Sequence, residues 1–131
     1  MFGIKKKSLG KKVLLIEDDA LLSKVLSQSF LKEKFQVVVV DNGLNVAEAV
    51  KNFSPDIILL DLIIPGIDGF AVLKQLKADV KTQKIPVAVI SNLGDEGDVK
   101  SSKALGADEY FIKSNTEMEK IVRYVKNKLK V

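Results

Sequence analysis

DIILLDLIIPGIDGF, residues 56–70, joins a short apolar run to an acid and a turn. Residues 57–60 are consecutively apolar and lie between Pro55 and Pro65-Gly66, which favours a strand buried on both faces over a helix. Asp61 follows this run directly, so we expect it at the carboxyl edge of a sheet, where open α/β sheets build their sites. From this stretch alone, a turn cap is an equally good role for Asp61.

The same apolar pattern occurs four more times in the chain. It predicts strands over residues 13–16, 35–40, 85–90 and 108–112. Between and after these runs, apolar residues at helical spacing predict helices that start at Ala20 and Met118 and that cover residues 46–53, 69–81 and 95–105.

Several short signals mark where the predicted helices begin and end. Asp19 and Asp68 are expected N-caps, Gly106 is an expected C-cap, and Ser114 with Glu117 has the spacing of a capping box. The apolar stripe expected on the first helix is Leu21, Leu22, Val25, Leu26 and Phe30. The helix over residues 95–105 has only a thin apolar face, so it is a candidate moving part. Asn42-Gly43 is interpreted as a strand-to-helix turn.

Strands and helices thus alternate five times, which requires a parallel sheet with helices on both faces. We predict an α/β fold, a flavodoxin-like, doubly wound, five-stranded parallel sheet of order 2-1-3-4-5. The chain of 131 residues is large enough for one domain, which we expect over residues 12–131 behind a basic tail over residues 1–11.

Composition excludes several kinds of chemistry and of partner. The chain has no Cys and no His, so disulfides, thiol catalysis and imidazole chemistry are excluded. No apolar run reaches the roughly eighteen residues of a membrane span and the start lacks a signal peptide, so we expect a cytoplasmic protein without membrane contact. The net charge of +4 comes from lysines near the two ends, with no interleaved aromatic residue, which disfavours nucleic-acid binding.

The predicted topology gathers polar side chains from four strands at one edge of the sheet. These are Glu17, Asp18, Asp61, Ser91 and Lys113. Three clustered carboxylates repel one another unless a cation lies among them, and hard oxygen ligands without His or Cys point to Mg²⁺. A carboxylate nucleophile beside Mg²⁺, a lysine and a hydroxyl suits phosphoryl transfer, with Asp61 becoming an aspartyl phosphate.

The motifs LLIEDD, DLIIPGIDG and YFIK, together with Ser91, resemble the receiver domain of bacterial two-component response regulators. The resemblance covers nearly all of the chain from Lys12 onward. It implies that Asp61 is the phosphoacceptor and that the metal ligands are Asp18, Glu17, Asp61 and the backbone carbonyl of Ile63. It also implies that Ser91 and Lys113 bind the phosphoryl group, and that Ser91 and Tyr110 form the switch.

Two positions depart from the receiver pattern. Ser114 stands where receivers usually have proline after the lysine, and a cis bond to a non-proline residue costs about 3 kcal/mol, so the sequence leaves open the turn that aims Lys113. Asn92 follows Ser91 where small residues are common.

The resemblance implies a single-domain response regulator rather than a conventional enzyme. It would promote its own Mg²⁺-dependent phosphorylation and dephosphorylation, and would take its phosphoryl group from a histidine kinase or phosphotransfer protein. Its output would be a contact with a downstream protein through the surface of residues 95–129, with the chain a monomer or a weak dimer on phosphorylation. The alternatives are a degenerate receiver that docks without phosphorylation, a carboxylate-nucleophile phosphatase, which Glu17-x-Asp19 fits poorly, and a flavin carrier, which the acidic loop disfavours.

Overall fold

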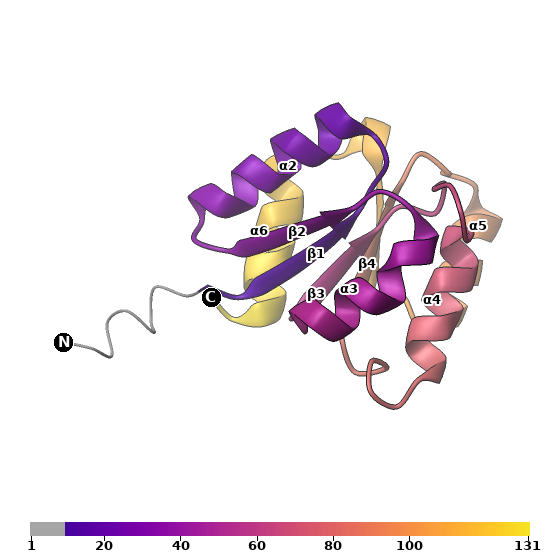
Figure 1. The fold of residues 1–131 in the computed structure, drawn as a ribbon. Coiled ribbons are helices and arrows are strands. Elements are labelled where there is room, and N and C mark those ends of the chain that lie inside the picture. The colour runs from indigo at the N-terminus through magenta and orange to yellow at the C-terminus, as the bar shows by residue number, and fades with distance from the viewer. Residues whose placement is uncertain (1–9) are drawn as a thin grey trace.

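A computed structural model describes residues 10–131 and confirms the predicted fold (Figure 1). Five strands form one parallel sheet in the order β2-β1-β3-β4-β5. The strands are β1 (Lys12–Ile16), β2 (Gln36–Val40), β3 (Ile57–Leu60), β4 (Val87–Ser91) and β5 (Glu109–Ile112). Of the predicted tail, residues 1–9 lie outside the described residues, so the tail remains a prediction.

Helices cover both faces of the sheet. They are α2 (Ala20–Lys32), α3 (Val46–Phe53), α4 (Gly69–Ala78), α5 (Glu96–Ala104) and α6 (Met118–Leu129), with short 3-10 turns η1 (Gly43–Asn45) and η2 (Lys113–Asn115). Figure 1 shows α2 and α6 on one face and α3 and α4 on the other. None of the helices described is long and apolar enough to cross a membrane.

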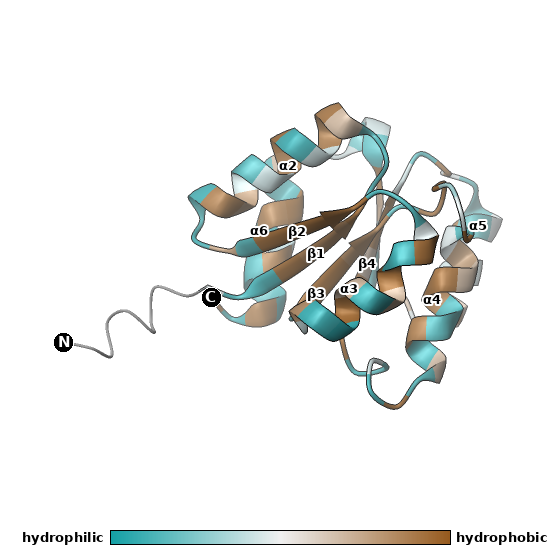
Figure 2. Cartoon of the chain, in the orientation of Figure 1, coloured by the Kyte–Doolittle hydropathy of each residue, from teal (hydrophilic) through white to brown (hydrophobic). Residues whose placement is uncertain are grey.

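The sheet separates two hydrophobic cores. Leu26 and Phe30 of α2 pack with Val125 of α6 on one face, and α3 and α4 cover the second core on the other face. The inner strands β3 and β4 are buried on both faces, and β3 is apolar throughout for this reason (Figure 2).

Two predicted N-caps place the helices that flank the central strands. The Asp19 carboxylate accepts hydrogen bonds from the backbone N–H groups of Leu21 and Leu22, at 3.0 and 3.1 Å. The Asp68 carboxylate accepts one from the N–H of Phe70 at 3.0 Å. These bonds satisfy donors that an α-helix leaves unpaired in its first turn, so α2 and α4 begin directly after the loops of β1 and β3.

Parts of the predicted helix faces were wrong. Leu21 is 73% exposed and Val25 is also exposed, because they lie on the flank of α2 while Leu26 and Phe30 face the sheet. The helix predicted over residues 69–81, with Val80 on its apolar face, ends at Ala78, so Val80 is 78% exposed.

The capping box predicted for the last helix does not form. Glu117 is the N-cap residue of α6 but makes no side-chain capping hydrogen bond, and Ser114 lies within η2. The hydroxyl of Thr116 instead donates to the backbone carbonyl of Ile112 at 2.8 Å. The box is absent because α6 begins only at Met118, so Ser114 lies three residues before the N-cap residue Glu117 rather than at the cap itself.

One edge of the sheet is formed by β2, which among residues 10–131 pairs only with β1. The N–H of Gln36 and the carbonyl of Val40 bond toward β1, so by alternation the backbone groups of Val37 and Val39 point away from the sheet. Val39 is also 42% exposed. The outer edge therefore presents valines and backbone polar groups side by side.

Gly69 allows the loop after β3 to close tightly. Its N–H donates to the carbonyl of Leu62 at 3.1 Å, and an added Cβ would lie 2.4 Å from the Leu62 Cα. Backbone atoms cannot yield to such a contact as a flexible side chain would. Residue 69 must therefore lack a side chain.

We expect Gly69→Ala to lower the free energy of unfolding by about 1–3 kcal/mol, the usual cost of overpacking. Gly97→Ala is the matched control, because no atom lies within 4 Å of its added Cβ, and alanine in a helix interior gains about 0.5–1 kcal/mol. Urea unfolding followed by circular dichroism measures both. Equal stabilities for the two variants would contradict the close approach at Gly69.

Candidate functional site

Strand register brings the predicted acids to one level of the sheet. Ile16 of β1 pairs with Leu60 of β3, so Glu17 and Asp61 are the next residues along two adjacent strands. The N–H of Asp61 donates to the carbonyl of Ile16 at 3.0 Å, and the N–H of Glu17 donates to the carbonyl of Val40 at 2.9 Å. The backbone of both acids is therefore fixed by the sheet rather than by a loop.

Three carboxylates converge at this edge. One oxygen each from Glu17, Asp18 and Asp61 lies within 4.8 Å of the others. Glu17 is 2% exposed and Asp61 is 4% exposed, whereas Asp18 faces solvent. The structure thus brings the three acids together, with one open side at Asp18.

Lys113 enters this cluster from the end of β5. Its Nζ lies 2.6 Å from Oδ2 of Asp61 and 2.7 Å from Oε1 of Glu17. The other Asp61 oxygen, Oδ1, accepts a hydrogen bond from the N–H of Ile63 at 3.0 Å. Lys113 reaches the acids although Ser114 follows it, and no peptide bond in residues 10–131 is cis.

Burial and the ion pairs shift the pKa values of Glu17 and Lys113. Burial raises the pKa of Glu17 despite the hydrogen bonds from Lys113 and from the backbone of Asp19. Burial alone would lower the pKa of Lys113, but the hydrogen bonds to Asp61 and Glu17 outweigh it, so the pKa of this ammonium is raised. Lys113 therefore stays charged and compensates one of the nearby negative charges.

Ser91 and Tyr110 lie beside the acids on the next two strands. Ser91 is fully buried at the end of β4, and its Oγ accepts from the N–H of Leu93 at 3.3 Å. The hydroxyl of Tyr110 donates to the carbonyl of Leu93. Burial raises the pKa of the Tyr110 phenol, and the nearby Ser91 hydroxyl opposes that shift. Tyr110 thus ties β5 to the loop between β4 and α5.

Sequence reasoning missed one acid beside the site. A hollow of about 330 Å³ adjoins the cluster and is lined by Glu17, Asp18 and Asp41. Asp41 directly follows β2, which is the same signal that singled out Asp61 after β3.

Two other strand-flanking acids have structural roles at the opposite edge. Asp56 accepts a hydrogen bond from the N–H of Lys12, and Asp108 accepts one from the N–H of Val87, both at 2.8 Å. Each acid thereby satisfies the N–H of a residue at the start of a neighbouring strand. They do not contribute to the acidic cluster.

The carboxylate cluster has the size and charge to hold one Mg²⁺. Ligands on opposite sides of Mg²⁺ lie about 4.2 Å apart, close to the 4.8 Å that bounds the three oxygens. Glu17, Asp18 and Asp61 carry three negative charges when ionised, and Lys113 supplies one positive charge. The net negative charge that remains is balanced by one divalent cation, and oxygen ligands suit Mg²⁺.

Comparison with known proteins identifies the family. The family model described as "Response regulator receiver domain" matches residues 13–126. The DNA-binding response regulator MtrA of Mycobacterium tuberculosis is 31% identical over 116 residues, which cover 88% of this chain and 50% of MtrA. The chain therefore spans about half the length of MtrA.

Two further proteins are similar over most of both chains. Sporulation initiation phosphotransferase F of Bacillus subtilis is 34% identical over 105 residues, which cover 80% of this chain and 83% of that protein. The crystal structure of the Mn²⁺-bound form of response regulator Rcp1 aligns with a TM-score of 0.78 and 27% identity, covering 88% of this chain and 91% of Rcp1. Receiver domains are phosphoacceptor signalling modules rather than enzymes in the usual sense. From its family match and from these relatives, the protein belongs to the response regulator receiver domain family.

Proposed function

We propose that Asp61 accepts a phosphoryl group and that the protein signals through this modification. The observation that carries the proposal is the contact between Asp61 and Lys113. The Lys113 ammonium holds the buried Asp61 carboxylate at the sheet edge, where two further acids lie beside it. The bond between an Asp61 oxygen and phosphorus forms as the donor's bond to phosphorus breaks. Lys113 then pairs with a phosphoryl oxygen and Ser91 donates its hydroxyl to another.

Mg²⁺ is the metal that we assign to this site. Glu17, Asp18, Asp61 and the Ile63 carbonyl would hold it, and the bound metal would neutralise charge on the phosphoryl oxygens. The exposed side of the cluster at Asp18 leaves room for water and phosphate oxygens, which Mg²⁺ normally keeps as ligands. The Mn²⁺-bound form of Rcp1 supports a divalent cation in a related protein.

A histidine kinase or phosphotransfer protein is the proposed donor, because the chain itself has no histidine to carry the group. Since a kinase takes its phosphoryl group from ATP, this proposal places the protein in the cytoplasm. In this proposal the donor supplies the phosphoryl group and the leaving group, and the other groups that take part in the transfer belong to the receiver. The receiver would therefore promote its own Mg²⁺-dependent phosphorylation and dephosphorylation.

The proposed output runs from Ser91 through Tyr110 to the surface of residues 95–129. A phosphoryl group that draws the Ser91 hydroxyl would disturb the Leu93 loop, where Tyr110 is anchored. The adjacent helix α5 buries only Ser102, whose hydroxyl bonds within the helix to the Val99 carbonyl at 3.0 Å. A helix with so little apolar anchoring is readily displaced by a small local shift.

Asp61→Asn should abolish phosphorylation by acetyl phosphate and Mg²⁺, because it removes the nucleophile while keeping the size of the side chain. Intact-mass spectrometry should find one phosphoryl group on the parent and none on the variant. Asp68→Asn is the matched control in the same loop, since asparagine caps a helix as well as aspartate does. Persistent labelling of Asp61→Asn would refute the assignment.

Asp18→Asn should slow Mg²⁺-dependent phosphorylation by roughly tenfold or more, because even outer-shell partners of a metal site are worth about that much. Asp19→Asn, at the neighbouring position, is the control, because it preserves the cap of α2 and should keep the parent rate of phosphorylation. EDTA should stop the reaction in every variant. Phosphorylation of the parent at an unchanged rate in EDTA would contradict a metal-dependent site.

Beryllofluoride with Mg²⁺ should shift amide NMR signals of α5, β5 and α6 as well as those of the Asp61 loop. Tyr110→Phe should reduce the shifts in α5, because it removes the hydroxyl that holds the Leu93 carbonyl. Tyr124→Phe, a change of the same kind in α6, serves as the control. Shifts confined to the Asp61 loop in the parent would count against the proposed output.

A further inference from the structure

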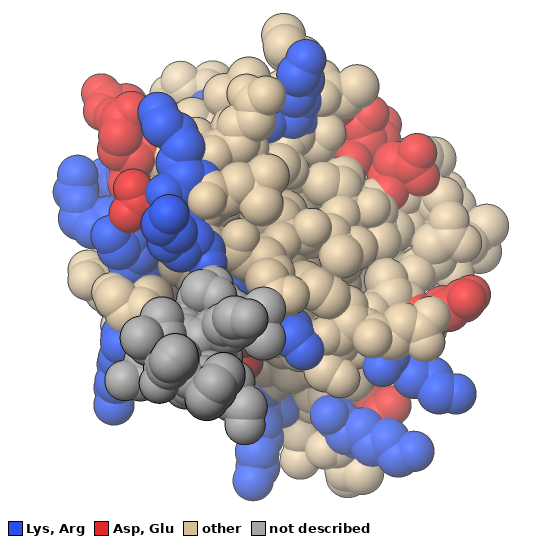
Figure 3. All heavy atoms as spheres, turned by 60° about the vertical axis from the view of Figure 1, so that its left-hand side comes forward, with Lys and Arg blue, Asp and Glu red and all other residues tan. Residues whose placement is uncertain are grey.

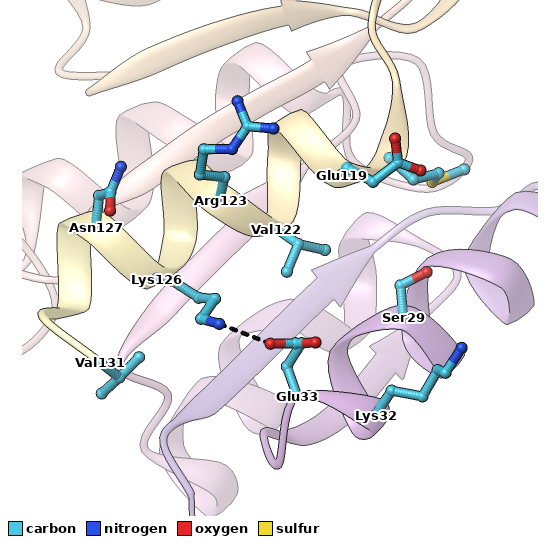
Figure 4. Close-up of a pocket in the computed structure, with 10 residues that line it drawn as sticks. Ser29, Lys32, Glu33, Glu119, Val122, Arg123, Lys126, Asn127 and Val131 are labelled. Carbon is cyan, nitrogen blue, oxygen red and sulfur yellow. Dashed lines mark hydrogen bonds and ion pairs between the residues drawn. The ribbon is translucent and has the colours of Figure 1, made fainter.

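A groove runs between α2 and α6, away from the loop that contains Asp61 (Figure 4). Its volume is about 550 Å³, and its lining includes the apolar side chains of Met118, Val122 and Val131. In Figure 4 the Val122 side chain points from α6 into the space beside α2. The groove therefore has apolar contact surface between α2 and α6.

The two helices that form the groove are strongly cationic. Helix α2 contains Lys24 and Lys32 and no acid. Helix α6 contains Lys120, Arg123, Lys126 and Lys128 and one acid, Glu119. Figure 3 shows Lys and Arg side chains on this side of the molecule, with some Asp and Glu side chains among them. Lys32 on α2 and Arg123 on α6 are exposed and line opposite walls. A bound partner would face positive charge on both rims.

One ion pair crosses the groove. The Nζ of Lys126 lies 2.6 Å from Oε1 of Glu33, and this contact lowers the pKa of Glu33. Both side chains are partly exposed, and ion pairs of that kind contribute little to stability. A carboxylate from a partner can therefore replace Glu33 beside Lys126 at little cost.

The lining favours a protein partner over nucleic acid. No aromatic residue lines the groove to stack on a base, and Glu33 and Glu119 interrupt the positive charge that a phosphate backbone would follow. An amphipathic helix matches the surface better, because its apolar stripe can pack on Val122 while acids on both flanks meet Lys32 and Arg123. The wall formed by α6 is 12 residues long, which corresponds to a partner helix of about three turns.

A second copy of the chain would not suit this groove. In a twofold interface the same patch meets itself, so the cations of α2 and α6 would face one another. Residues 1–9 have the wrong charge as well, since they contain three lysines and no acid. The charge pattern thus selects an acidic partner from another protein.

We propose that the groove between α2 and α6 binds an acidic amphipathic helix of about three turns from a partner protein. The apolar residues of that helix, at positions i, i+3 or i+4 and i+7, contact Met118 and Val122. Its acids pair with Lys32, Arg123 and Lys126. This contact uses none of the residues assigned to phosphoryl transfer, although α6 also belongs to the proposed output surface of residues 95–129.

The test is an NMR titration of the whole protein with a stapled twelve-residue helix that carries leucines along one stripe and glutamates elsewhere. Stapling is needed because isolated helices of that length are marginal in water. Saturable shifts should appear at residues of α2 and α6 that line the groove. A peptide with lysine in place of every glutamate, and duplex DNA, should both leave those signals unmoved.

Lys32→Glu with Arg123→Glu should raise the Kd of the acidic peptide by about tenfold or more, since it reverses charge on both rims. Lys51→Glu with Lys74→Glu, on α3 and α4, is the charge-matched control and should keep the parent Kd. Thermal unfolding by circular dichroism verifies that each variant is folded. The proposal is overturned if the acidic peptide gives no saturable shifts in the groove, if it binds both double variants equally, or if DNA moves the groove signals and the peptide does not.

Discussion

Two buried carboxylates depend on a single ammonium. Glu17 and Asp61 end adjacent strands and are almost inaccessible to water, a position that ionised acids occupy only when charge or hydrogen bonds compensate them. Lys113 contacts both, from a strand two places away from β3 in the sheet. Losing the ammonium would leave two uncompensated charges and cost several kcal/mol. The ends of β1, β3 and β5 are therefore held in one relative position by electrostatics as well as by backbone pairing.

The parallel sheet converts residues far apart in sequence into one site. Lys113 lies 52 positions beyond Asp61, yet both follow strands that end at the same edge. Hydrogen bonds between loops strengthen this edge, as when the N–H of Gly43 donates to the Pro65 carbonyl at 2.9 Å. Rigid support at the acids contrasts with α5, whose one buried residue is Ser102. The molecule thus places a fixed cluster of acids next to a helix with few buried side chains, an arrangement that suits the switching we propose.

Local sequence signals predicted the strands and the acid cluster because they depend on backbone alternation and capping. Asp61 after an apolar run and Asp19 before a helix are both placed as expected. The burial of side chains on helix flanks was harder to predict, because helical spacing does not show how wide the contact between helix and sheet is. Leu21 was therefore expected on the buried face but is exposed. Ser114 was misassigned as a cap because η2 intervenes before α6. The two ion pairs of Lys113 required the tertiary structure, since sequence alone offered several acids as partners.

The outer edge of β2 has a consequence for handling the protein. Val37 and Val39 direct backbone groups outward that have no partner in the described part of the chain, on a strand without proline or charge. Such an edge is a template on which an extended segment of another molecule can add as a new strand. Aggregation through this route rises with concentration and depends on the β2 edge rather than on the stability of the cores. A charged residue in place of Val39 would block strand addition while leaving the pairing of β2 with β1 in place.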